Sequence, residues 1–230
     1  GADVIKFTST GGVLSQQGRG LGKHFTDVEM TSIVDTARQL GLSVAAHSHG
    51  ARGIEGAANA GVDSIEHGTF ADAAALKAMK KHNAFMVPTL MAFKGIEARL
   101  GTGTYTTTVE VKVRETLSSL GDALKTAHKM GIRTAFGTDA GVFRHGDNAK
   151  EFALMAEYGG MTPQEIMVAA TVNAATLLGV EKQTGTLEPG KSADLIATLE
   201  NPIETIGTFE NIAFVMAKGT VVVNRAGEEK

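Results

Sequence analysis

Residues 42–50 read Leu-Ser-Val-Ala-Ala-His-Ser-His-Gly, a short apolar run that ends in a His-x-His pair. The run Leu42–Ala46 predicts a buried strand, and His47 follows it directly. A helical pattern at Asp27–Leu40 precedes this strand, and a second at Ile54–Ala60 follows it. Glycines end both helical patterns. A strand between two helices is the unit from which parallel sheets are built.

The same alternation extends along the chain in both directions. The predicted strands are Val4–Phe7, Leu42–Ala46, Ser64–Glu66, Ala84–Val87 and Ile132–Phe136. The predicted helices are Asp27–Leu40, Ile54–Ala60, Ala71–Lys81, Val111–Met130, Asn148–Tyr158 and Pro163–Leu178, the last with Thr162 as its N-cap. Repeated strand–helix units predict an α/β fold with a parallel sheet, either a barrel or a doubly wound sheet.

The sequence pattern changes after Gly179, where short β runs replace the helical periodicity. These runs are Asp194–Leu199, Ile212–Met216 and Val221–Asn224, with Pro-Gly, Asn-Pro and Lys-Gly turn signals around them. We therefore expect residues 1–180 to form the α/β part and residues 181–230 to form part of a small β domain.

Composition excludes several kinds of function. The chain has 230 residues, 22 basic and 25 acidic, so its net charge of −3 argues against binding to nucleic acid or to an acidic membrane surface. It has no run of about 18 apolar residues that would predict a membrane span. Cysteine is absent, which excludes disulfides and thiolate metal ligands. A cysteine-free chain folds in either redox state, so the compartment stays open.

Polar residues stand at the ends of four predicted strands. They are Lys6, His47 with His49, His67 and Asp139. Each alone has an ordinary structural role, but in a (β/α) barrel the carboxyl ends of the strands meet at the catalytic face. Imidazoles and carboxylates bind divalent ions of the Zn, Fe, Ni and Mn class, and such an ion lowers the pKa of a bound water to about 7. The pattern predicts a metal-dependent hydrolase.

A set of motifs resembles the amidohydrolase superfamily over essentially the whole chain. They are Val4–Phe7 with Thr10–Gly12, Ala46–Gly50, Ile65–Thr69, Phe136–Gly141, Asn173–Ala175 with Leu177–Gly179, and Gly185–Leu187 with Pro189–Leu195. They are most similar to the binuclear branch related to imidazolonepropionase. That branch includes Xaa-Pro dipeptidases, arginine/lysine carboxypeptidases and ochratoxin-type amide hydrolases. The resemblance implies hydrolysis of a peptide or an N-acyl amino acid and, in addition, a homo-oligomer.

The resemblance also implies the roles of individual residues. Lys6 would carry a carbamate that bridges two divalent metal ions, with zinc expected and manganese, iron or cobalt as alternatives. His47 and His67 would bind one ion. Asp139 would bind the other and would act as general base and acid. His49 and His145 are candidates for substrate binding.

One departure from the family pattern matters. The family's first His-x-His lies on the first barrel strand, whereas His47–His49 here matches the fifth strand and Lys6 the fourth. The resemblance thus implies an incomplete (β/α)8 TIM-type barrel, its last five βα units, with part of a small β-sandwich domain. Five strands cannot close a barrel of eight. We expect the chain to be the C-terminal part of a longer enzyme, with the N-terminal part as its partner and little activity alone.

Two other interpretations stay open. A mononuclear deaminase or cyclic-amide hydrolase would not need the carbamate on Lys6. The other is a catalytically incomplete chain that serves as a scaffold. Such a chain would have no use for Lys6, His47, His67 and Asp139, but the missing strands keep this interpretation open.

Overall fold

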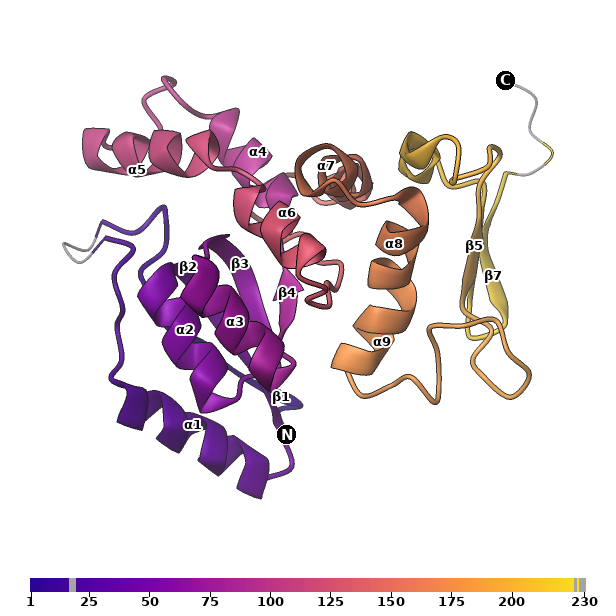
Figure 1. Cartoon of the computed structure of the whole chain (residues 1–230). Coiled ribbons are helices and arrows are strands. Elements are labelled where there is room, and N and C mark those ends of the chain that lie inside the picture. Colours follow the sequence, from indigo (N-terminus) through magenta and orange to yellow (C-terminus); the bar gives the residue numbers. More distant parts are fainter. Residues whose placement is uncertain (17–19, 226, 228–230) are drawn as a thin grey trace.

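The central feature of the fold is a parallel sheet. The computed structural model describes residues 1–16, 20–225 and 227. Four strands, labelled in Figure 1, pair in the order of the chain: β1 (Val4–Thr8), β2 (Ser43–Gly50), β3 (Ser64–Phe70) and β4 (Phe85–Val87). The first four of the five predicted strands are confirmed, with β2 and β3 extending through the histidines that follow them. The α/β prediction is therefore confirmed.

The two faces of this sheet differ. Helices α1 (Asp27–Gln39), α2 (Ala51–Ala60) and α3 (Ala73–His82) cover one face (Figure 1). Val44, Ala46 and Ile65 are fully buried. Because side chains alternate along a strand, the opposite face carries Lys6 and His47, which are exposed and half-buried. This second face, which these three helices leave open, is the one on which the predicted site residues lie.

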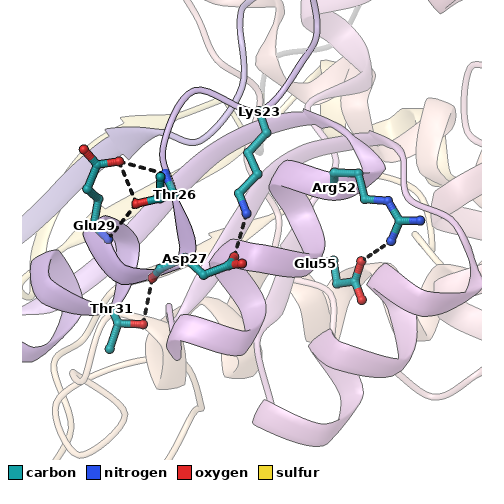
Figure 2. A network of polar contacts seen from close by, with 7 residues as sticks. All are labelled: Lys23, Thr26, Asp27, Glu29, Thr31, Arg52 and Glu55. Carbon is teal, nitrogen blue, oxygen red and sulfur yellow. Dashed lines mark hydrogen bonds and ion pairs between the residues drawn. The ribbon is translucent and has the colours of Figure 1, made fainter.

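Short-range polar contacts fix where α1 begins. Thr26 and Glu29 form a capping box at the start of α1, in which each side chain bonds the other's backbone amide (Figure 2). In the same view Lys23 lies 2.6 Å from Asp27, and Arg52 of α2 lies 2.7 Å from Glu55. Exposed pairs of this kind contribute little to stability. The capping box explains why the helix begins at Asp27, as predicted.

The predicted strand Ile132–Phe136 forms only a single bridge. Thr134 pairs in parallel with Met86 of β4, and the Ala135 amide donates to the Met86 carbonyl at 2.9 Å. The neighbouring groups bond elsewhere, because the Phe136 amide donates to Ala169 and the Asn173 side chain to the Thr134 carbonyl. The segment thus lies beside β4, but the prediction of a full strand is wrong.

The predicted long helix Val111–Met130 is also wrong, because it is two helices. They are α5 (Thr107–Ser118) and α6 (Asp122–Lys129). Gly121 lies between them with φ of 83°, and a Cβ atom there would lie 2.4 Å from Cβ of Tyr158. Only glycine allows this left-handed turn together with so close an approach. A further helix, α4 (Leu90–Glu97), follows β4 and was not predicted.

The C-terminal third begins with a helical region. It contains η1 (Asp147–Ala149), α7 (Lys150–Gly159), α8 (Pro163–Val168), the π-helical η2 (Ala169–Asn173) and α9 (Ala174–Leu177). The predicted helices Asn148–Tyr158 and Pro163–Leu178 correspond to this region, and Thr162 forms the predicted cap. The π turn inside the second helix was not predicted.

A small antiparallel sheet follows, with strands β5 (Leu195–Ala197), β6 (Phe214–Ala217) and β7 (Thr220–Asn224). It matches the three predicted β runs. The 3₁₀ turn η3 (Ile206–Glu210) joins it to α7, since the ring of Phe209 stacks on Phe152 with centroids 4.2 Å apart. Among the helices that the structure describes, none is both long and apolar enough to cross a membrane.

Candidate metal centre

Two histidines from neighbouring strands face each other at the carboxyl end of the sheet. Nε2 of His67 lies 2.9 Å from Nδ1 of His47, and the rings are 4.6 Å apart at 75°. The strand register pairs His47 with Glu66, so simple alternation would point His67 the other way. His67 instead has φ of 70°. This left-handed conformation is uncommon for a side chain of its size, and it brings the two imidazoles together.

In two of the histidines, Nδ1 forms a hydrogen bond with a threonine hydroxyl. Oγ1 of Thr89 lies 2.6 Å from Nδ1 of His67 and donates its own hydrogen to the Pro88 carbonyl at 2.8 Å. The hydroxyl oxygen is then left to accept Nδ1–H, so His67 presents a bare Nε2 lone pair toward His47. Nδ1 of His49 lies 2.9 Å from Oγ1 of Thr69. Metal-binding histidines are typically oriented through their second nitrogen in this way.

The environment keeps the histidine cluster uncharged. Burial, and next the charge of Lys6, lowers the pKa of His47. Burial and the neighbouring His47 lower the pKa of His49 to about 3. Burial, followed by His49, holds the pKa of His67 well below its usual value. Neutral imidazole is the form that binds metal ions, so these nitrogens are available at neutral pH.

The third histidine is close but differently oriented. One ring nitrogen from each of His47, His49 and His67 lies within 4.8 Å of the other two. The rings of His49 and His67 are stacked, 4.8 Å apart and only 12° from parallel. Because imidazole lone pairs lie in the ring plane, those of His49 and His67 lie in two nearly parallel planes. By contrast, Nδ1 of His47 and Nε2 of His67 lie 2.9 Å apart, in rings inclined at 75°.

These histidines open into a pocket of about 170 Å³. Asp139 lines it with φ of 55°, and Phe93 and Ile96 of α4 add an apolar wall. The rest of the lining includes Gly12–Ser15, Ala92 and Val142. The Lys112 amine from α5 donates to the carbonyls of Gly12 and Ser15 and so holds the loop at the pocket edge. The arrangement places metal-binding groups beside space for a partly apolar molecule.

The predicted site residues are only partly brought together. His47, His49, His67 and Asp139 line one pocket. Lys6 is exposed on β1, the edge strand, and pairs with Ala45, so it shares a sheet face with His47 but is not part of the pocket lining. His145 is exposed on the loop before η1 and lies outside the lining. The roles of all six residues stay predictions, and for Lys6 and His145 the pocket adds no support.

Sequence reasoning missed Thr69, Thr89 and Lys112. Thr69 lies near the end of β3, two residues after His67, and Thr89 follows β4, two residues after Val87; those positions were the available signal. Lys112 carried no signal, because it reaches the loop from a helix that is distant along the chain.

Comparison with known proteins agrees with this geometry. Residues 1–222 match the profile of the amidohydrolase family. Ochratoxinase from Aspergillus niger is 36% identical over 211 residues, which are 91% of this chain and 43% of that protein. An imidazolonepropionase from Rhizorhabdus wittichii is 32% identical over 81% of this chain and 43% of that protein.

A solved Xaa-Pro dipeptidase with methionine bound in its active site has a TM-score of 0.92 and 42% identity. That match covers 97% of this chain and 55% of the dipeptidase. The chain thus spans about half the length of the relatives it matches. With the profile match extending from residue 1 to residue 222, the chain belongs to the amidohydrolase family.

Proposed function

We propose that this chain carries part of the active site of a metal-dependent hydrolase that cleaves a peptide or N-acyl amide bond, as dipeptidases and carboxypeptidases do. One observation carries the proposal. Nδ1 of His47 and Nε2 of His67 face each other at 2.9 Å, and the rings open on a pocket that Asp139 also lines. Membership of the amidohydrolase family, with an ochratoxinase and a Xaa-Pro dipeptidase among the similar proteins, supports this reaction class.

The residues present fit a divalent metal ion. Two nitrogens that bind one tetrahedral ion must approach each other closely, and Nε2 of His67 and Nδ1 of His47 already do so, at 2.9 Å. Nε2 of His47 is buried and forms no hydrogen bond of acceptable geometry within the described residues. His47 and His67 would hold one ion. A carbamate on Lys6, together with Asp139, would hold a second, with zinc expected and manganese, iron or cobalt as alternatives.

The remaining residues would handle substrate and protons. A bound divalent ion supplies Lewis acidity toward the scissile carbonyl and toward a water molecule. Asp139 would accept a proton from that water and deliver it to the leaving amine. His49 would contact the substrate through its free ring nitrogen, with Phe93 and Ile96 as the apolar wall. His145, exposed on its loop, would reach the substrate only if that loop folds over the pocket.

The proposal includes a missing partner. We infer that residues 1–180 are the last five βα units of an incomplete (β/α)8 barrel and that residues 181–230 are part of a small β domain. The exposed edge of β1 supports this, since Val4 is 49% exposed and Lys6 is open to solvent on the edge strand. The partner is the N-terminal part of the same enzyme, which would cover β1, and the assembled enzyme is a homo-oligomer.

Metal content and hydrolysis test the proposal together. The chain is purified alone and with its N-terminal part, metal is measured by elemental analysis, and dipeptides and N-acyl amino acids are assayed. We expect one ion or fewer in the chain alone and two in the assembled protein, with hydrolysis only in the second. One ion in the assembled protein, without hydrolysis of these substrates, would instead favour a mononuclear deaminase or cyclic-amide hydrolase. Metal-free, inactive assembled protein would favour a scaffold.

A further inference from the structure

Glu151, in the first turn of α7, is a fully buried carboxylate that the chemistry above does not use. Among the described residues no cation pairs with it. Burial raises its pKa to about 7, and the two backbone hydrogen bonds that it accepts oppose that rise. A buried carboxyl group without an ion pair is costly and is retained where its hydrogen bonds matter.

Both oxygens of Glu151 cap a different helix. Oε1 accepts from the Leu90 amide at 2.8 Å, and Oε2 accepts from the Met91 amide at 2.6 Å. These are the first two residues of α4, whose amides have no partner inside their own helix. A helix N-terminus also favours a negative charge. The carboxylate of α7 therefore fixes the first turn of α4.

The residue before α4 cannot provide this cap itself. Thr89 is in the N-cap position but makes no side-chain cap bond, because its hydroxyl contacts His67 and the Pro88 carbonyl. Its backbone is also left-handed, with φ of 51° and ψ of 42°. That conformation is strained for a β-branched residue and persists only where neighbouring contacts hold the backbone in place. The bonds from Glu151 to the next two residues are such contacts.

We propose that Glu151 is a positioning residue for the metal centre: by holding the first turn of α4, it places the Thr89 hydroxyl where it fixes the orientation and tautomer of His67. The inference rests on the proposed metal site. It requires an acceptor at both oxygens, which a carboxylate offers and an amide does not. In Glu151→Gln the amide nitrogen would meet one of the two backbone N–H groups, two donors face to face.

The experiment uses four variants of the chain, two of which are controls. Glu151→Gln and Thr89→Val interrupt the proposed contacts at their two ends. Thr89→Ser keeps the hydroxyl. Met155→Ala, at a fully buried position on the same helix α7, destabilises the core and keeps the Glu151 carboxylate. Urea unfolding places the four variants on one stability scale.

Two readouts separate positioning from general stability. The first is the affinity for Co²⁺, followed by its absorption spectrum. We expect a loss of about tenfold in Glu151→Gln and about 10–100-fold in Thr89→Val, the range found when such supporting contacts are removed. Thr89→Ser and Met155→Ala should stay within about twofold of the parent. The double variant Glu151→Gln/Thr89→Val should bind no more weakly than Thr89→Val, because both act through one contact.

The second readout is the His67 tautomer in the metal-free chain, measured by long-range ¹H–¹⁵N correlation. The parent and Met155→Ala should show hydrogen on Nδ1, and Glu151→Gln and Thr89→Val a mixture. Parent affinity with an unchanged tautomer in Glu151→Gln, or fully additive losses in the double variant, would overturn the inference. A parent chain that binds no Co²⁺ but shows the tautomer shift would contradict the proposed metal site and still support the positioning role. If Glu151→Gln does not fold, the Co²⁺ affinity and the His67 tautomer are measured in Glu151→Asp instead.

Discussion

His67 contacts the side chain of His47, although the register of β2 and β3 pairs it with Ser48. The 2.9 Å contact between Nε2 of His67 and Nδ1 of His47 exists because His67 departs from the extended backbone, with φ of 70°. Thr89 and Asp139, at the ends of the next two segments, have φ of 51° and 55°. Of these three left-handed residues, His67 and Asp139 line the pocket and Thr89 contacts His67. Such strain is characteristic of functional sites.

Replacing either facing histidine should abolish metal binding. In His47→Ala or His67→Ala one of two ligands is lost, and we expect the affinity of the chain for Zn²⁺ or Co²⁺ to fall by at least about 100-fold, as the loss of a direct ligand must exceed that of a supporting contact. Isothermal titration measures this. The matched control is His145→Ala, since His145 is exposed and outside the pocket. Equal losses in the control would indicate adventitious binding to surface histidines.

The metal-free chain should lose stability as the pH falls below about 6.5, the usual pKa of histidine. Burial depresses the pKa of His49 to about 3 and lowers those of His47 and His67. The unfolded chain therefore binds more protons than the folded one in this range. Each fully shifted histidine contributes a slope of about 1.4 kcal/mol per pH unit. Urea unfolding from pH 7 to pH 4 measures the slope.

Glu151 should act in the opposite direction over part of this range. Its pKa of about 7 lies above 4.5, the ordinary value for a glutamate, so the folded chain binds the extra proton between these two values. This contribution to stability is lost as the pH rises.

His49→Asn should reduce the slope of stability against pH in the acid range by about one proton. His82→Gln, at an exposed position on α3, should leave it unchanged. An unchanged slope in His49→Asn would show that the histidine is not buried as described.

Gly121→Ala should destabilise the chain more than the equivalent change at Gly131. Both glycines are left-handed, with φ of 83° at Gly121 and 71° at Gly131. In that conformation alanine is less stable by roughly 1 kcal/mol or more. At Gly131 a Cβ atom would meet nothing within 4 Å, but at Gly121 it would lie 2.4 Å from Tyr158. Overpacking of this kind adds a further loss of about 1 kcal/mol or more. The difference in the free energy of unfolding measures this second part, and equal losses would contradict the tight turn between α5 and α6.

Much of the α/β part could be predicted from the sequence, because apolar runs and helical periodicity report which residues are buried. His47 and His67 could be placed at strand ends for the same reason. The break at Gly121 could not, since a glycine inside a helical pattern is tolerated, and only the contact with Tyr158 makes it obligatory here. The single bridge at Thr134 likewise depends on Asn173, distant in the sequence.

The supporting contacts of the site were not predictable for a related reason. Thr89 precedes α4, whose apolar start Leu90–Phe93 has no polar face that would distinguish a helix from a strand or a loop. Glu151 resembles an ordinary acidic residue in the first turn of an exposed helix. Its burial arises from packing of α7 against other elements, α4 among them. Local patterns do not encode such contacts between helices.

Substitution of His49 tests whether this residue binds metal or substrate. Its ring is stacked on that of His67 at 12°, so the lone pairs of the two rings lie in separate, nearly parallel planes, which does not suit binding of one ion by both. We therefore expect His49→Asn in the assembled enzyme to keep both metal ions and to lose hydrolysis, chiefly through a higher KM. His47→Asn, matched in chemistry and on the same strand, should lose one ion. Elemental analysis and steady-state kinetics on the two variants measure this. Loss of an ion in His49→Asn would make the three histidines one coordination sphere, and the stacked geometry would then have to open when metal binds.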